Sequence, residues 1–349
     1  MICSDTTTIE LLKALWQRVL RRPDLRVDDN FFAMGGDASL AVTLFEEIAR
    51  DFGRELSPLL ICQAPTVELL SALLEQRTAP SLASTALLRT GVEEPPVFVA
   101  HGLGGCLMEF FDLLKHIRPP NAIYGLHARG LDGLNPPFES IEEMAEFHLD
   151  AIQKVQPSGP YFLVGYSLGG LVMLEIAQRL LQKSQGVALL CMLDSYPHIG
   201  RLSLGQRARL SARLAQRFAV RAMRQPIRSV LSRAFRRAAE LKQLEGERRG
   251  EVRVQAAGVR LTRAMRLVRK GSQRALVRYQ PRFFPGRIRF LRAESPSVFP
   301  NDPSAVWACL AETFEVETVP GDHVTMLTKH ADALGSALSR YLVEAGCRD

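Results

Sequence analysis

Apolar residues in the first part of the chain recur every three to four positions, the spacing of one helix face. One such run ends near Arg21-Arg22-Pro23, a second begins after a loop at about residue 40, and a third begins at Pro65-Thr66. The apolar positions of the first two runs are Ile9, Leu12, Leu15, Trp16, Val19 and Leu20, then Leu40, Leu44, Phe45 and Ile48. The pattern predicts a small bundle of three helices over residues 1–77.

The pattern changes after Pro96, where short apolar runs alternate with helical stretches. Strands are expected at 97–100, 122–126, 161–164, 187–193, 288–291 and 314–319, and helices at 108–117, 141–155 and 169–183. Such alternation is typical of a mainly parallel sheet that helices cover on both faces. Residues 78–95 are small and polar with little periodicity, which predicts a linker. We therefore expect an all-α unit, a linker, and an α/β domain over residues 96–349.

Composition adds little to this picture but excludes some classes of protein. Of 349 residues, 47% are hydrophobic and 23% are charged, as in an ordinary globular protein. The sequence contains neither a long uninterrupted apolar run nor a signal peptide, so we expect a cytoplasmic protein with no membrane partner. Six cysteines are scattered without metal-ligand spacing, and we expect no metal site and no disulfide framework.

A candidate nucleophile lies in Gly165-Tyr166-Ser167-Leu168-Gly169, between a predicted strand and a predicted helix. A sharp turn at this place strains the backbone and brings neighbouring chain very close, which explains glycines two residues to either side of the serine. The same residues could form a tight turn without chemistry. The flanking strand and helix favour a nucleophile elbow with Ser167 at its tip.

A serine nucleophile needs a base and an acid that orients the base, and in this class of fold they follow the serine in the order acid, then histidine. Three histidines lie far enough along: 198, 323 and 330. His323 follows a predicted strand in a loop, whereas the other two suit structural roles. Asp194 ends the most apolar predicted strand, so we expect it to be the acid. Asp322 and Asp302 remain alternatives.

Two backbone amides are expected to form an oxyanion hole. One is that of Leu168, directly after the serine, and the other is that of Leu103, in the glycine-rich loop His101-Gly102-Leu103-Gly104-Gly105 after an early strand. The glycines could instead form a phosphate-binding loop, but their spacing fits neither of the common nucleotide-binding motifs.

The helical unit contains Asn30-Phe31-Phe32, then Gly35-Gly36-Asp37, followed by a helix. This string resembles the carrier (thiolation) domains of nonribosomal peptide synthetases and related megasynthases. In that family, a serine after Gly-Gly-Asp carries a 4'-phosphopantetheine arm. Ala38 occupies that position here and cannot be modified, whether through engineering or natural loss. Ser39, one residue later, is the fallback attachment site. The alternative to a carrier domain is a helical bundle that contains a glycine turn without any attached group.

The His101-Gly102 loop, the Ser167 turn and Gly321-Asp322-His323-Val324-Thr325-Met326-Leu327 are together similar to the motifs of type I thioesterases that end such synthetases. The resemblance implies an α/β-hydrolase fold with an inserted helical lid, here at about 200–280. It also implies release of a carrier-bound acyl or peptidyl thioester through an acyl-Ser167 ester, by hydrolysis or cyclisation. Upstream adenylation or condensation modules and a phosphopantetheinyl transferase are the implied partners. A non-catalytic docking module and an editing thioesterase or acyltransferase are the alternatives.

The charge is concentrated in the insertion. Residues 201–280 hold 22 Arg and Lys against 4 Glu, a net charge of +18, which leaves −11 for the rest of the chain. A solvated helix face accounts for such a pattern without any function. Nucleic-acid binding would also use it, but no recognition motif accompanies it, and we expect no nucleic-acid partner. Residues 1–77 carry a net charge of −4. The third hypothesis is therefore that the acidic carrier docks on the basic lid.

Overall fold

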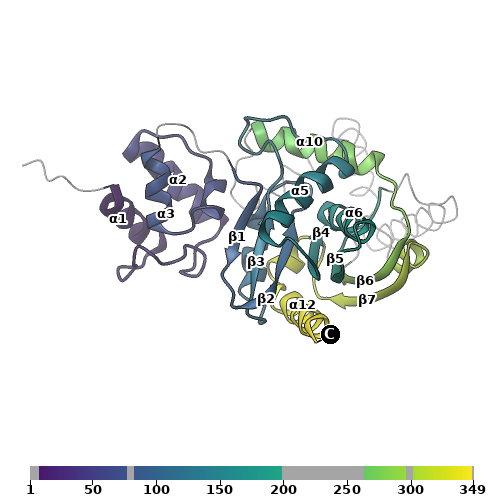
Figure 1. Cartoon of the computed structure of the whole chain (residues 1–349). Coiled ribbons are helices and arrows are strands. Elements are labelled where there is room, and N and C mark those ends of the chain that lie inside the picture. The colour runs from purple at the N-terminus through teal and green to yellow at the C-terminus, as the bar shows by residue number, and fades with distance from the viewer. Residues whose placement is uncertain (1–7, 77–81, 199–262, 296–301, 348–349) are drawn as a thin grey trace, which may run out of the picture.

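The computed structural model describes residues 8–76, 82–198, 263–295 and 302–347 (Figure 1). A helical unit at the N-terminal end is followed by a larger domain built on a sheet. The helical unit contains α1 (Thr8–Leu20), α2 (Ala38–Phe52), a 3-10 turn η1 (Pro58–Cys62) and α3 (Val67–Glu75). The Asp37 carboxylate caps α2 by accepting from the Leu40 amide at 2.8 Å, and the Thr66 hydroxyl caps α3.

The sheet of the larger domain has seven strands within the described residues, in the order β1-β3-β2-β4-β5-β6-β7. Their bounds are β1 (Thr85–Arg89), β2 (Glu93–Ala100), β3 (Asn121–Leu126), β4 (Tyr161–Tyr166), β5 (Val187–Leu193), β6 (Phe284–Ala293) and β7 (Ala311–Val319). Every neighbouring pair is parallel except β1 and β3. The predicted, mainly parallel sheet is thus confirmed.

One sequence expectation needs correction at the first strand. We expected residues 78–95 to form a linker, but Thr85–Arg89 forms β1 and Glu93 begins β2. β1 is an edge strand that buries Ala86 and Leu88 and leaves Leu87 exposed. With only two buried side chains, the alternation of apolar and polar residues in β1 is too short to predict a strand from the sequence.

Helices cover both faces of the sheet (Figure 1). On one face lie α5 (Ile141–Val155), α6 (Leu168–Gln182) and α10 (Arg263–Arg278); on the other lie η2 (Leu107–Phe110), α4 (Phe111–Leu114) and α12 (Ala331–Gly346). The short elements α11 (Ser304–Trp307) and η4 (Thr325–Leu327) flank β7. The side chains of β4 alternate between the two hydrophobic cores. Phe162 and Val164 face one core, and Tyr161 and Leu163 face the other.

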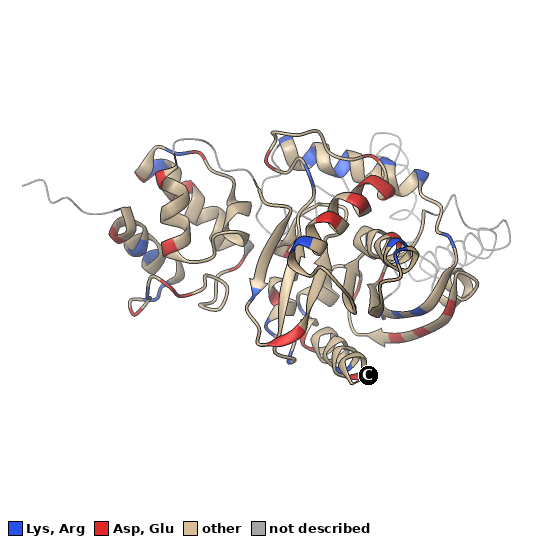
Figure 2. Ribbon diagram, viewed as in Figure 1, with Lys and Arg blue, Asp and Glu red and all other residues tan. Residues whose placement is uncertain are grey.

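Most of the predicted lid lies outside the described residues, since only its end, α10, is among them. α10 is strongly basic, and Figure 2 shows its charges beside the acidic residues of α5. Arg274 and Arg278 both pair with Glu139, which lies just before α5. None of the helices in the described part of the chain is long and apolar enough to cross a membrane.

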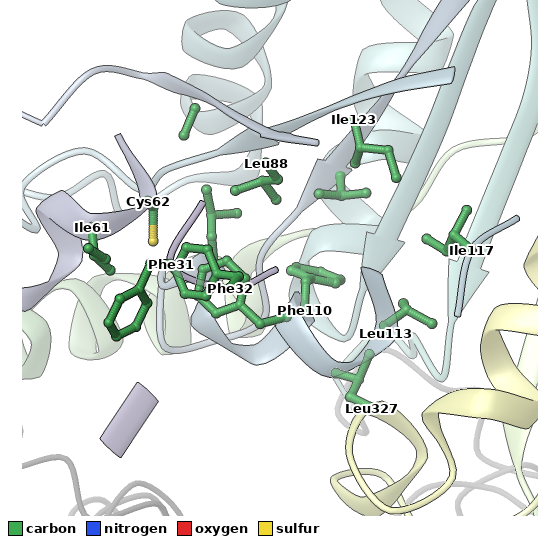
Figure 3. Packing of buried hydrophobic residues seen from close by; sticks show 14 of the residues in the cluster. Phe31, Phe32, Ile61, Cys62, Leu88, Phe110, Leu113, Ile117, Ile123 and Leu327 are labelled. Carbon is green, nitrogen blue, oxygen red and sulfur yellow. The ribbon is translucent and has the colours of Figure 1, made fainter. Parts of the chain in front are cut away.

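The helical unit packs against the larger domain through apolar side chains (Figure 3). Trp16, Phe31 and Phe32 form a row of edge-to-face rings, and Phe32 stacks on Phe111 of α4 with ring centroids 3.4 Å apart. Leu59 of η1 joins a second cluster with Leu131 and with Met265 and Val268 of α10. None of the ion pairs between described residues joins the two units.

Candidate active site

Ser167 lies at a sharp turn between the end of β4 and the start of α6. Its backbone has φ 55° and ψ −117°, a left-handed conformation that costs a non-glycine residue energy. The glycines around it have no room for a side chain. A Cβ at Gly165 would overlap the carbonyl of Gly169, and a Cβ at Gly169 would overlap the carbonyl of Ala100. The turn is therefore held in its strained form by close backbone packing on both sides.

The structure brings Ser167, His323 and Asp194 into one line of hydrogen bonds. His323 Nε2 lies 3.1 Å from Ser167 Oγ, and His323 Nδ1 lies 2.7 Å from Asp194 Oδ2. Asp194 directly follows β5, and its other oxygen accepts from the Ala293 amide of β6 at 3.3 Å. The three residues are 9%, 7% and 3% exposed, respectively. Burial keeps competing water away from the line, so each bond is stronger than it would be at the surface.

The alternative acids and histidines are placed elsewhere. The Asp322 carboxylate accepts from the amides of Val324 and Thr325 and so shapes the loop that carries His323. Asp302 accepts from the Ser304 amide at the start of α11. His330 is the residue before α12. His198 is the last residue of a described segment and is itself in neither a helix nor a strand.

The two expected oxyanion donors lie on segments that touch. Leu168 is the first residue of α6, and the first amides of a helix have no partner within it. Leu103 lies in the loop between β2 and η2. This loop packs directly on α6, because Gly169 lies against the carbonyls of Ala100 and His101. The carbonyl of Gly102 is fixed by the Gly105 amide at 3.2 Å and by His101 Nδ1 at 2.7 Å.

Tyr166 is a feature of the site that sequence reasoning missed. Its hydroxyl donates to the backbone carbonyl of His323 at 2.5 Å, and its ring stacks on the His323 ring with centroids 4.9 Å apart. The residue before the nucleophile thus holds the histidine loop against β4. The only sequence signal was an aromatic residue within the glycine–serine turn, which a buried strand also explains.

Glu109 of η2 was also missed. Its carboxylate accepts a hydrogen bond from the Gly102 amide at 2.5 Å, and burial raises the pKa of the carboxyl to about 7. The sequence offered no signal, because Gly102 was expected in the glycine-rich loop and Glu109 in a separate helix at 108–117.

Three histidines are buried beside the same loop. His101 and His148 have ring centroids 5.8 Å apart, and burial lowers the pKa of His101, His127 and His148. Each is therefore neutral near pH 7. The part of the chain that the structure describes contains no cluster of His, Cys, Asp and Glu that could hold a metal ion.

A cleft of about 600 Å³ lies between the second half of α6, α5 and the residues after α10. Its buried Glu175 binds Arg179, Arg282 and the Tyr279 hydroxyl. Ser167, His323 and Asp194 do not line this cleft, so it does not belong to the candidate active site.

In the helical unit, Ala38 is the first residue of α2 and Ser39 is the second, with an exposed side chain. Gly35 has φ 97°, and Gly36 lies against the Phe31 ring, where a Cβ would overlap it. The Gly-Gly-Asp string thus forms the tight turn and the cap that present the start of α2.

Comparison with known proteins identifies two families along the chain. Residues 95–342, more than half of the chain, match the thioesterase domain family. The chain belongs to this family. Residues 10–74 match the phosphopantetheine attachment site family, so a carrier domain precedes the thioesterase domain. This order is that of the C-terminal carrier and thioesterase regions of nonribosomal peptide synthetases, to which the chain is homologous.

Several curated relatives are much longer proteins. The chain is 39% identical over 190 residues to a dimodular nonribosomal peptide synthase of Bacillus subtilis, which covers 54% of the chain and 8% of that protein. It is 33% identical over 174 residues to enterobactin synthase component F of Escherichia coli O157:H7. This match covers 49% of the chain and 13% of that protein. The chain therefore spans only a small part of these relatives.

Solved structures share the fold. A four-domain nonribosomal peptide synthetase, holo-AB3403, aligns over 97% of this chain and 26% of its own, with a TM-score of 0.57 and 23% identity. The NocB thioesterase domain aligns over 72% of this chain and 95% of its own, with a TM-score of 0.51 and 21% identity. The predicted carrier bundle and α/β-hydrolase fold are confirmed.

Proposed function

We propose that this chain is a chain-terminating thioesterase that releases an acyl or peptidyl group from a thioester through an ester on Ser167. The observation that carries the proposal is the line of hydrogen bonds from Asp194 through His323 to Ser167, on a strained turn. A serine hydroxyl becomes a useful nucleophile when a neighbouring base accepts its proton, and an acid fixes the tautomer of that base.

The proposed reaction has two halves. His323 Nε2 accepts the Ser167 proton as the hydroxyl oxygen attacks the thioester carbonyl, and the amides of Leu103 and Leu168 stabilise the resulting oxyanion. The intermediate then expels the thiol, which takes the proton from His323, and an acyl-Ser167 ester remains. Water, or an amine or hydroxyl of the acyl chain itself, attacks the ester with His323 again as base. The products are a free acid or a ring.

Loss of the serine tests this proposal. Ser167→Ala is expected to abolish hydrolysis of a short acyl N-acetylcysteamine thioester, and a fluorophosphonate probe is expected to label the unaltered protein at Ser167. The rival function is a docking module that retains the fold without the chemistry. An unlabelled Ser167 together with equal turnover by the Ala variant would favour that rival. Acyl transfer to an added nucleophile in place of hydrolysis would favour the editing or transferase function.

The carrier domain does not fit its family's cofactor as the chain stands. A phosphopantetheine arm is attached through a serine oxygen, and Ala38 has none. We propose that the attachment position is Ala38 and that Ser39 does not replace it, since one step along a helix turns a side chain by about 100°. No part of the proposed reaction therefore depends on an arm on this chain.

Restoring the hydroxyl tests the assignment of the attachment position. The Ala38→Ser variant, treated with a phosphopantetheinyl transferase and coenzyme A, is expected to gain one arm by intact mass. The unaltered chain, which still holds Ser39, is expected to gain none. Modification of the unaltered chain would move the site to Ser39, and no modification of either would remove this function from the helical unit. A loadable form would take its acyl group from upstream synthetase modules.

A further inference from the structure

Glu109 lies on a turn whose backbone cannot move freely. Its neighbours in η2, Leu107 and Phe110, are fully buried in the core beneath the sheet. The turn is capped at its start by Cys106, whose sulfur accepts from the Met108 amide at 3.4 Å. The carboxylate of Glu109 therefore extends from a rigid base toward the glycine-rich loop.

The carboxylate binds the peptide group directly before the one that carries the Leu103 amide. Glu109 accepts from the Gly102 N–H, while the Gly102 carbonyl is held by the Gly105 amide and lies against His101 Nδ1. A peptide unit is planar, so fixing the Gly102 carbonyl also fixes the direction of the Leu103 N–H. Two consecutive peptide planes are thus held, one of them by Glu109.

Gly102 is enclosed from two sides. A Cβ there would lie 3.1 Å from the Tyr166 ring and 3.3 Å from the Glu109 carboxylate. Tyr166 in turn stacks on His323. The loop that carries Leu103 is therefore held between the Tyr166 ring, which contacts His323, and the Glu109 carboxylate.

Glu109 is half-buried beside Gly102, and desolvation of its carboxyl raises the pKa of Glu109 to about 7. Its titratable neighbour is the Cys106 thiol, whose own pKa burial raises to about 12, so this neighbour is neutral near pH 7. A carboxyl whose pKa is shifted in this way beside a candidate active site is a candidate for a role in that site.

We propose that Glu109 is a positioning residue for the reaction, which holds the loop so that the Leu103 amide faces the substrate oxygen at Ser167. This inference rests on the proposed thioesterase function and adds to it the group that orders the oxyanion hole.

The test compares Glu109→Met, Glu109→Gln and Glu109→Asp in the full chain, with the short acyl N-acetylcysteamine thioester as substrate. Methionine keeps the size but removes the acceptor. Because losing one oxyanion donor costs about 10²–10³ in kcat, misplacing it is expected to cost about tenfold or more, with KM unchanged. Glutamine keeps a carbonyl acceptor and is expected to retain most of the activity. Aspartate keeps the carboxyl group but is too short, so kcat is expected to fall.

Asp112→Asn is the matched control, because Asp112 lies three residues on, is exposed, and pairs with Lys115 at 3.0 Å. Its kcat is expected to equal that of the unaltered protein. If Glu109→Met fails to fold, the Asp and Gln variants decide the matter. Full kcat in the Met or Asp variant, or an equal loss in the Gln and Met variants, would overturn the role. Ser167→Ala separates the two proposals, since its inactivity beside an active unaltered protein upholds the proposed function whatever Glu109 does.

Discussion

At the scale of single residues, the site depends on side chains that support the hydrogen-bonded line without belonging to it. Tyr166 joins β4 to the loop of His323 by both a ring contact and a hydrogen bond. The hydrogen bond fixes the backbone of the histidine, and the ring limits the rotation of its side chain. The geometry of the histidine therefore depends on the residue directly before the nucleophile.

Tyr166→Phe is expected to lower kcat several-fold while the stacked ring stays in place. The lost hydrogen bond contributes about 1 kcal/mol, and if all of it affects the placement of His323, kcat falls about fivefold. Tyr161→Phe on the same strand is the matched control, because its hydroxyl also donates to a backbone carbonyl, that of Gln156, far from the site. Steady-state kinetics and thermal unfolding of both variants check this. Equal kcat values in the two variants would show that the Tyr166 hydroxyl has only a structural role.

Glu109 makes a second prediction, about stability and pH. Its pKa is raised from 4.5 to about 7, so between these values the native state holds a proton that the unfolded state has released. Stability from this group is present below about pH 4.5 and is lost as the pH rises toward 7. Glu109→Gln has no such loss, so its melting temperature minus that of the unaltered protein is expected to increase from pH 5 to pH 8.

The difference between the two proteins isolates this one group. The lowered pKa values of His101, His127 and His148 also make stability depend on pH, but they act alike in both proteins. Scanning calorimetry across the pH range measures the difference. A constant gap would mean that the Glu109 carboxyl titrates alike in the folded and unfolded chains.

At the scale of elements, the position of α6 against β2 fixes the site. The helix can approach the strand end only because Gly169 has no side chain, as a Cβ there would meet the carbonyls of Ala100 and His101. Gly169→Ala is expected to destabilise the protein by about 1–3 kcal/mol, as overpacking does, and to lower kcat by moving α6 away from the loop. Denaturant unfolding and steady-state kinetics measure both effects.

Gly104→Ala is the control for this substitution. Gly104 lies in the loop between β2 and η2, on which α6 packs, and a Cβ there would meet nothing within 4 Å. Its stability and kcat are expected to stay close to those of the unaltered protein. Equal damage from both substitutions would mean that the loss does not come from the close approach of α6 to the end of β2.

The elements also show what the sequence could and could not reveal. Strands such as 187–193 are long, apolar and bounded by turns, so their periodicity was enough to predict them. The helix expected at 108–117 is instead two short turns, η2 and α4, because the segment packs locally against the core and the glycine-rich loop. Ser167, Asp194 and His323 could be picked out by chain order and strand ends. Glu109 and Tyr166 could not, since their partners are set by packing in three dimensions.

At the scale of the whole molecule, the described contacts between the two domains are mainly apolar, beside one hydrogen bond from the Ala83 amide, just before β1, to Gln63 Oε1 at 3.0 Å. The sequence suggested that an acidic carrier docks on a basic lid through charge. In the part of the chain that the structure describes, Phe32 stacks on Phe111, and Leu59 packs on Met265 and Val268 of α10. Charge pairing with residues 199–262 lies outside those ranges and stays a hypothesis. The two kinds of contact differ in their response to salt, since screening weakens exposed charge pairs and leaves apolar burial intact.

Phe32→Ala is therefore expected to expose the surface that the carrier covers. Hydrogen exchange measured by mass spectrometry should become faster in residues 107–114, which include Phe111, and stay unchanged in α5 and α6. Leu11→Ala, at an exposed position of the carrier, is the control and should change neither region. Raising the salt concentration to about 1 M shortens the Debye length to about 3 Å and so screens exposed charge pairs. Exchange in residues 107–114 of the unaltered protein should nevertheless stay unchanged, because the contacts that cover them are apolar. If salt alone reproduced the effect of Phe32→Ala, charge rather than the stacked rings would hold the carrier in place.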